Sequence, residues 1–297
     1  MQLRTAERKR AKIKMALQGP SGSGKTYSAL LLAYGLCNNW ERIVVIDSEN
    51  QSANLYAHLG KYKVLDIQAP FTPEKYIEAI EACEKAFMEV IIIDSLSHPW
   101  EGIGGLLDTL NNMTGNSYTN WNKLTPRQNS FMQHILQSPT HLIATIRSKQ
   151  DYVLTEKNGK MVPEKVGLKG IQREGIEYDF TLVFELDMKN NASSSKDRTS
   201  IFINKPEFKI TPTTGEMILE WCNQQIPIDD FDSNIVQLIN QCKTIEELLK
   251  LYKENPSIQN SMLSQFTRKR QLLTVKDDLK TIINKQNITT NGTTNNK

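Results

Sequence analysis

The sequence predicts an α/β protein: a mostly parallel sheet flanked by helices, with an antiparallel extension and a small C-terminal helical appendage. Two observations lead to this fold class. Short apolar runs of the kind that form buried strands alternate with segments of helical spacing, which is typical of a parallel sheet with crossover helices. The last two apolar runs, 180–186 and 199–203, flank the polar loop Lys189–Arg198, and this short connection favours an antiparallel pair.

The expected elements follow one another along the chain. Strands are predicted at 13–18, 42–47, 62–68, 90–94, 141–146, 180–186 and 199–203, and helices at 26–37, 52–59, 73–88, 126–136 and 215–222. Thr72 is expected to cap the helix 73–88, with Glu74 in its first turn. Residues 147–177 contain Lys and Gly but little apolar pattern, so we expect a long loop there.

Composition narrows the class of protein. The 297 residues carry 36 Lys and Arg against 33 Asp and Glu, a formal net charge of +3. The longest apolar runs are too short to span a membrane, and the N-terminus lacks the apolar stretch of a secretory signal. The four cysteines are widely spaced, which is typical of reduced thiols. We therefore expect a cytoplasmic protein without a membrane partner.

The chain is expected to comprise four parts. A basic arm, residues 1–12, leads into the α/β core, residues 13–225. A Pro- and Asp-containing segment then introduces a helical appendage, residues 226–283. Residues 284–297 are rich in Asn and Thr and lack aromatic side chains, so they are predicted to be a disordered tail.

A glycine-rich segment between the first strand and the first helix predicts a phosphate-binding loop. Its residues, which match the pattern G-x-x-x-x-G-K-[ST] in full, are Gly19, Pro20, Ser21, Gly22, Ser23, Gly24, Lys25 and Thr26. Glycines let the backbone approach phosphate oxygens, and the helix N-terminus adds positive potential. We expect ATP and Mg²⁺ as cofactors, with Lys25 on the β- and γ-phosphates and the Thr26 hydroxyl on the metal.

Two acidic residues at strand ends are candidates for the rest of the chemistry. Asp94 ends the apolar run 90–94 and is expected to hold Mg²⁺ through water. The next residue is Ser95 rather than Glu, so the base that activates the attacking water must lie elsewhere. Glu49 follows the second strand near the same sheet edge and is the best candidate.

Together these segments resemble the RecA superfamily of recombinases and hexameric motor ATPases over residues 13–222. The resemblance implies a RecA-like P-loop NTPase core. It assigns Thr145 to a γ-phosphate sensor position that is usually Gln. It also matches Lys196 and Arg198 to a basic pair that reaches the nucleotide of a neighbouring subunit, which implies self-association into a ring or filament.

The resemblance is closer to short phage-encoded ATPases related to single-strand-annealing recombination proteins, on the segments 121–127, 165–168 and 172–178. It implies single-stranded DNA as a partner, recombination or replication proteins as further partners, and the bacterial host cytoplasm as the location. Residues 147–173 hold seven basic and three acidic side chains, a local charge of +4 (seven minus three). The candidate DNA-binding residues there are Arg147, Lys149, Tyr152, Lys157, Lys160, Lys165, Lys169 and Arg173.

Other functions fit the same motifs. The basic segment 147–173 is also compatible with a solvated loop that only covers the nucleotide. A P-loop kinase for a nucleotide or small molecule would use it as a lid, although Lys196 and Arg198 would then have no role. A non-catalytic, ATP-gated loader is the third reading.

Overall fold

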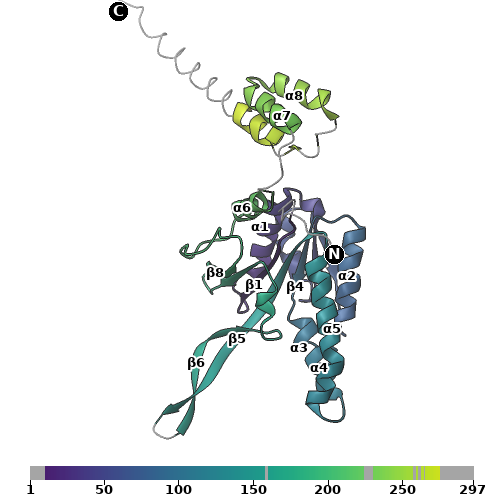
Figure 1. Cartoon of the computed structure of the whole chain (residues 1–297), viewed down its shortest axis with the longest axis vertical. Helices are drawn as coiled ribbons and strands as arrows, with labels where there is room; N and C mark the ends of the chain where they lie inside the picture. Colours follow the sequence, from purple (N-terminus) through teal and green to yellow (C-terminus); the bar gives the residue numbers. More distant parts are fainter. Residues whose placement is uncertain are drawn as a thin grey trace, which may run out of the picture. The chain divides into compact units, whose positions relative to one another are not determined.

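The computed structural model describes residues 11–157, 160–223, 230–256, 259, 262, 263 and 265–274 (Figure 1). Contacts within the chain divide it into two units, Met1–Ile226 and Pro227–Lys297. Most of the expected basic arm and all of the expected disordered tail lie outside the described residues. Within the described part of the chain, no helix combines the length and the apolar character that a membrane span requires.

The first unit is built on one eight-stranded sheet. Its strands are β1 (Lys14–Gly19), β2 (Ile43–Asp47), β3 (Lys63–Asp66), β4 (Val90–Asp94), β5 (His141–Lys157), β6 (Lys160–Gly170), β7 (Leu182–Leu186) and β8 (Ala192–Asp197). The order is β3-β2-β4-β5-β1-β7-β8, with β6 paired to β5. All pairs from β3 to β7 are parallel, whereas β7–β8 and β5–β6 are antiparallel. The predicted fold class, an α/β core with a mostly parallel sheet and an antiparallel extension, is confirmed.

Helices cover both faces of this sheet, because successive residues of each buried strand point to opposite sides. The helices are α1 (Lys25–Cys37), α2 (Pro73–Lys85), α3 (His98–Glu101), α4 (Leu106–Asn112), α5 (Ser117–Gln137) and α6 (Pro212–Asn223), with 3₁₀ turns at Trp40–Arg42, Ser52–Leu59 and Ile176–Tyr178. One face, with Met15 and Ile92, packs on α1 and α6. The other, with Ile91 and Ala144, packs on α2 and α5.

The segment 147–170 corrects one sequence-based expectation. It is not a long loop: β5 continues past the core to Lys157 and returns as β6, so the two strands form a ribbon that leaves the sheet (Figure 1). The sequence signal for this hairpin is the Asn-Gly dipeptide at 158–159, which is typical of hairpin turns. The residues before and after this dipeptide show little alternation of apolar and polar side chains, so the sequence did not predict the two strands. A ribbon that protrudes from the domain has no side that packs on the core, and so no such alternation is required.

Two other boundaries also differ from expectation. The helix predicted at 126–136 begins at Ser117, with Pro126 inside it. The strand predicted at 199–203 is absent from the described chain, and β8 lies instead within the predicted loop Lys189–Arg198. The reason lies at Asp197, whose carboxylate accepts hydrogen bonds from the amides of Thr199 and Phe202, so the backbone turns there.

The second unit, considered by itself, is helical where it is described. It contains α7 (Asp230–Gln241), α8 (Ile245–Glu254) and a helical stretch at 265–274. Ile235, Ile239, Leu248 and Phe266 form its apolar core. A capping box between Thr244 and Glu247 sets the start of α8.

Candidate nucleotide site

The loop between β1 and α1 is shaped to surround a phosphate group. β1 ends at Gly19 and α1 begins at Lys25. Gly22 and Gly24 have φ angles of 84° and 79°, which side-chain-bearing residues rarely adopt. A Cβ at Gly24 would also lie 2.8 Å from the side-chain nitrogen of Asn190. The glycines therefore let the loop curve at the N-terminus of α1, where free amides favour an anion.

Lys25 lies inside the curve of this loop. Its Nζ donates hydrogen bonds to the carbonyl oxygens of Gly19 at 2.9 Å and Pro20 at 2.8 Å. Burial lowers the pKa of Lys25, while the nearby carboxylates of Asp94 and Glu49 act in the opposite direction. The ammonium group is thus desolvated and ready to pair with an anionic ligand.

Asp94 joins the loop to two hydroxyl groups. Thr26 Oγ1 donates to Asp94 Oδ2 at 2.6 Å, and Thr145 Oγ1 donates to Asp94 Oδ1 at 2.5 Å. Asp94 is 2% exposed, and its burial raises the pKa of its carboxyl, whereas the two hydrogen bonds lower it. Mg²⁺ prefers oxygen ligands, such as those of hydroxyl and carboxylate groups, so Thr26 and Asp94 fit the metal that the motif implies.

Glu49 lies at the same edge of the sheet and is paired with an arginine. Arg147 Nε donates to Glu49 Oε1 at 2.7 Å, and Arg147 Nη2 contacts Oε2. The preceding turn is fixed by Asp47, whose carboxylate accepts the amides of Glu49 and Ala53. Burial raises the pKa of Glu49, but hydrogen bonds from Arg147 and Ser95 outweigh it and hold that pKa below its usual value.

These groups open into a cleft of about 1020 Å³. Glu49, Asp94 and Arg147 lie along it together with residues of the phosphate loop. The cleft also contains residues that the sequence did not single out: Tyr27, Ser28, Leu31, Ser52, Tyr56, Ser148, Ile171, Asn190, Lys209, Ile210 and Thr211. Tyr27, Ser28 and Leu31 follow the motif directly in α1, and the others come from segments far apart in the sequence, so no local pattern marks them. The rings of Tyr27 and Tyr56 lie 5.6 Å apart and give the cleft an aromatic part.

Lys196 and Arg198 lie together but outside the cleft of their own chain. Lys196 Nζ donates to the carbonyl oxygens of Glu177, at 3.1 Å, and Tyr178. Arg198 Nη2 donates to the Tyr178 carbonyl at 3.3 Å. The two cations therefore meet on one backbone segment, and a role on a nucleotide requires that nucleotide to belong to another copy.

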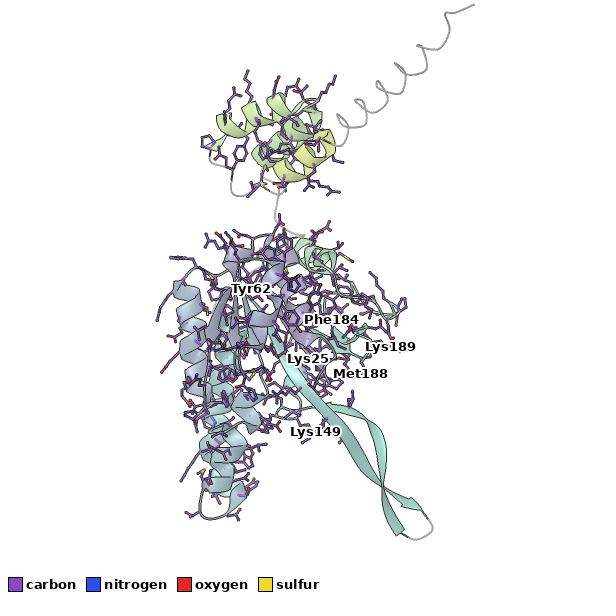
Figure 2. The ribbon with its side chains drawn as sticks, turned by 180° about the vertical axis from the view of Figure 1, so that it is seen from behind. Lys25, Tyr62, Lys149, Phe184, Met188 and Lys189 are labelled. Carbon is purple, nitrogen blue, oxygen red and sulfur yellow. The ribbon has the colours of Figure 1, made fainter. Side chains whose placement is uncertain are left out.

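The candidate DNA-binding residues fall into three groups. Arg147 faces Glu49 in the nucleotide cleft. Lys149 is exposed on β5 (Figure 2), Lys169 forms an ion pair with Glu174 at 3.2 Å, and Arg173 is half-buried. The side chains of Tyr152, Lys157, Lys160 and Lys165 lie outside the described residues. Their backbones belong to the hairpin, where the register opposes Tyr152 to Lys165 and Lys157 to Lys160.

The strand–loop–helix unit, with Lys25, Thr26 and Asp94, defines a P-loop nucleotide-binding protein. A family model described as an AAA domain matches residues 11–211, and the chain belongs to this AAA-domain family of P-loop ATPases. The family implies use of a nucleotide, typically with Mg²⁺.

One similar solved structure is a KaiC-like protein from the hyperthermophilic archaeon Pyrococcus horikoshii OT3. The two chains are 18% identical, and the match covers 69% of this chain and 88% of the other, with a TM-score of 0.39. No curated protein shows significant similarity to the chain.

Proposed function

We propose that this chain hydrolyses ATP to control its binding to single-stranded DNA through the β5–β6 hairpin, and that neighbouring copies complete its active sites. One observation carries the proposal. The base of the hairpin, at Arg147, Ser148 and Ile171, lies along the nucleotide cleft. A change in the occupancy of the cleft therefore acts directly on the segment that bears the basic ribbon.

The chemistry follows from the arrangement of polar groups in the cleft. The loop amides and Lys25 bind the phosphates, and Thr26 and Asp94 would hold Mg²⁺, which would supply positive charge at the phosphate oxygens. Glu49 orients a water molecule and accepts its proton. The water oxygen bonds to the γ-phosphorus as the bond to the β–γ bridging oxygen breaks, and ADP leaves.

Charge supports the DNA partner. Arg147 is neutralised by Glu49, so it is left out of the local count. Lys169 pairs with Glu174, so the count extends to that residue: residues 148–174 hold six basic and four acidic side chains, a charge of +2 (six minus four). A basic ribbon that protrudes from the domain suits a phosphate backbone, and Tyr152 offers a ring for base stacking.

Self-association is supported by Lys196 and Arg198, which lie away from their own cleft. In a ring or filament they would stabilise the charge that develops on the γ-phosphate of a neighbour. We further propose a phage-encoded protein that acts in recombination or annealing with recombination or replication proteins, in the bacterial host cytoplasm.

ATP hydrolysis and oligo(dT) binding, measured side by side, test the proposal. We expect oligo(dT) to stimulate hydrolysis, ATP to change the affinity for oligo(dT), and Glu49→Gln to abolish turnover while ATP binding persists. Glu74→Gln is the matched control, because Glu74 forms a similar ion pair with Arg127 away from the cleft. Turnover stimulated by a nucleoside monophosphate and not by oligo(dT) would indicate a kinase. ATP-dependent oligo(dT) binding without turnover would indicate a loader.

A further inference from the structure

We infer that Arg147 restrains Glu49 in an inactive arrangement, and that loading of the β5–β6 hairpin draws Arg147 away and releases Glu49 for hydrolysis. Arg147 is thus a positioning residue in the nucleotide site rather than a contact to DNA. The inference rests on the proposed function, because it assigns Glu49 as the base and the hairpin as the ligand-binding element.

The first step is the state of the Glu49 carboxylate. Both of its oxygens face the guanidinium group, with Nε at 2.7 Å from Oε1 and Nη2 on Oε2. The Glu49 side chain is 17% exposed and the Arg147 side chain 41%, so the carboxylate is shielded from water while the guanidinium group is partly in contact with it. A carboxylate that accepts two charge-assisted hydrogen bonds is a weak base, and it must lose at least one of them to take a proton from water.

The second step is the position of Arg147 along β5. On one side Arg147 is in register with Gly19, the first residue of the phosphate loop. On the other side its carbonyl accepts the amide of Ile171 at 2.6 Å, directly after β6 ends. The next pair outward, Ser148 with Gly170, already belongs to the ribbon. Arg147 is therefore the residue at which the central sheet becomes the hairpin.

The third step is a second link from the hairpin to the catalytic edge. Gln172, two residues after β6, is buried, and its Nε2 donates to the carbonyl of Leu96 at 2.7 Å. The amide of Leu96 in turn donates to the carbonyl of Thr145, which precedes Arg147 by two residues in β5. A displacement of β6 would therefore move two segments together: Leu96, which follows Asp94, and Thr145, which precedes Arg147.

The comparison with a second arginine–carboxylate pair supports a regulatory role. Arg127 and Glu74 also form two hydrogen bonds, both at 2.7 Å, and they join α5 to α2 on the outer surface. That pair only ties two helices together. In the Arg147–Glu49 pair, by contrast, the arginine contacts both oxygens of the carboxylate that is proposed to act as the base. This arginine lies at the base of the hairpin that is proposed to bind the ligand.

The test uses the full chain and compares wild type, Arg147→Ala, Arg147→Lys and the control Arg127→Ala. The kcat and KM for ATP are measured with and without oligo(dT). Without oligo(dT), we expect Arg147→Ala to raise kcat about tenfold, a barrier change of about 1.4 kcal/mol, with little change in KM. Addition of oligo(dT) to Arg147→Ala should then raise its kcat only a little further. Arg147→Lys keeps the positive charge but cannot donate two hydrogen bonds to both carboxylate oxygens, so its kcat should lie between those of wild type and Arg147→Ala. The kcat of Arg127→Ala should match that of wild type.

The double variant Glu49→Gln/Arg147→Ala shows whether the gained hydrolysis uses Glu49, since the inference requires the double variant to be inactive. Thermal melting and binding of a fluorescent ATP analogue confirm that each variant is folded and binds nucleotide. A folded, ATP-binding Arg147→Ala or Arg147→Lys whose kcat without oligo(dT) stays at or below that of wild type would overturn the inference. Failure of wild type to bind oligo(dT) would instead overturn the proposed function, while a raised kcat in Arg147→Ala would still establish the restraint on Glu49.

Discussion

Thr145 donates its hydroxyl hydrogen to Asp94 across two adjacent parallel strands, with 2.5 Å between Thr145 Oγ1 and Asp94 Oδ1. Both side chains are almost fully buried. The residue at the expected sensor position thus contacts the proposed metal-binding carboxylate. This relationship suggests that Thr145 orients Asp94, and that its influence on the γ-phosphate passes through that carboxylate.

Thr145→Val is expected to lower both stability and Mg²⁺-dependent turnover. The change leaves Asp94 Oδ1 without its donor in a buried position, which costs about 1–3 kcal/mol of unfolding free energy. Chemical denaturation measures that loss, and a magnesium titration of ATP hydrolysis measures the second effect. Thr145→Ser keeps the hydroxyl and is the control. Equal stability and metal dependence in the valine and serine variants would show that the hydrogen bond is unimportant.

Tyr56→Ala is expected to weaken nucleotide binding about tenfold, because a stacked ring contributes about 1–3 kcal/mol per base. Tyr56 is half-buried in the cleft and pairs with Tyr27. Equilibrium binding of a fluorescent ATP analogue measures the change. Tyr56→Phe retains the ring and should bind like wild type. If the alanine variant binds ATP normally, the base lies in another part of the cleft.

Lys25→Ala should abolish nucleotide-dependent assembly, because the loop loses the cation that pairs with the phosphates. Lys196→Ala should bind ATP but hydrolyse it poorly, because the neighbour's phosphates lose a cation. A mixture of the two inactive variants should regain part of the activity. ATP on a Lys196→Ala subunit then meets an intact Lys196 from a Lys25→Ala subunit.

This complementation separates action between copies from action within one copy. Light scattering follows assembly, and phosphate release follows turnover in the mixture and in each variant alone. Lys61→Ala, an exposed lysine on the same unit, is the control for charge removal. A mixture no more active than the average of its components would place Lys196 outside any shared active site.

Replacement of Lys157, Lys160 and Lys165 by Ala should weaken oligo(dT) binding and reduce its salt dependence. Each lost phosphate contact on single-stranded DNA lowers the slope of log K against log salt by about 0.7, so three lower it by about 2. Binding titrations over a range of salt concentrations measure the slope. Alanine at the exposed Lys61, Lys63 and Lys85 removes the same charge elsewhere. An equal effect from both triple variants would mean that only net charge matters.

The sequence was sufficient for the parts of the fold that local patterns encode. The strand leading into Gly19 and the helix starting at Lys25 carry a motif whose spacing is fixed by phosphate geometry, so the structure follows the prediction there. The apolar runs that end at Asp47 and Asp94 are buried on both faces and pair in parallel as expected. Glu49 therefore reaches the same edge as Asp94.

The parts that the sequence did not reveal depend on long-range contacts. Arg147 and Glu49 are 98 residues apart, and a basic segment gives no sign that its first arginine is already paired with an acid. The aromatic part of the cleft brings Tyr27 in α1 next to Tyr56 in a 3₁₀ turn. Periodicity predicts which face of an element is buried, but not which distant polar groups share a cavity.

The continuity of β5 also bears on how such a protein can change over evolutionary time. The strand pairs with β4 as far as Ala144 and with β1 as far as Arg147, and the residues beyond Arg147 belong to the ribbon. The outer ribbon can therefore lengthen, shorten or exchange its surface residues in pairs without altering the packing of the nucleotide site. If the ribbon binds a ligand as proposed, a change of ligand would then leave the nucleotide site unaltered.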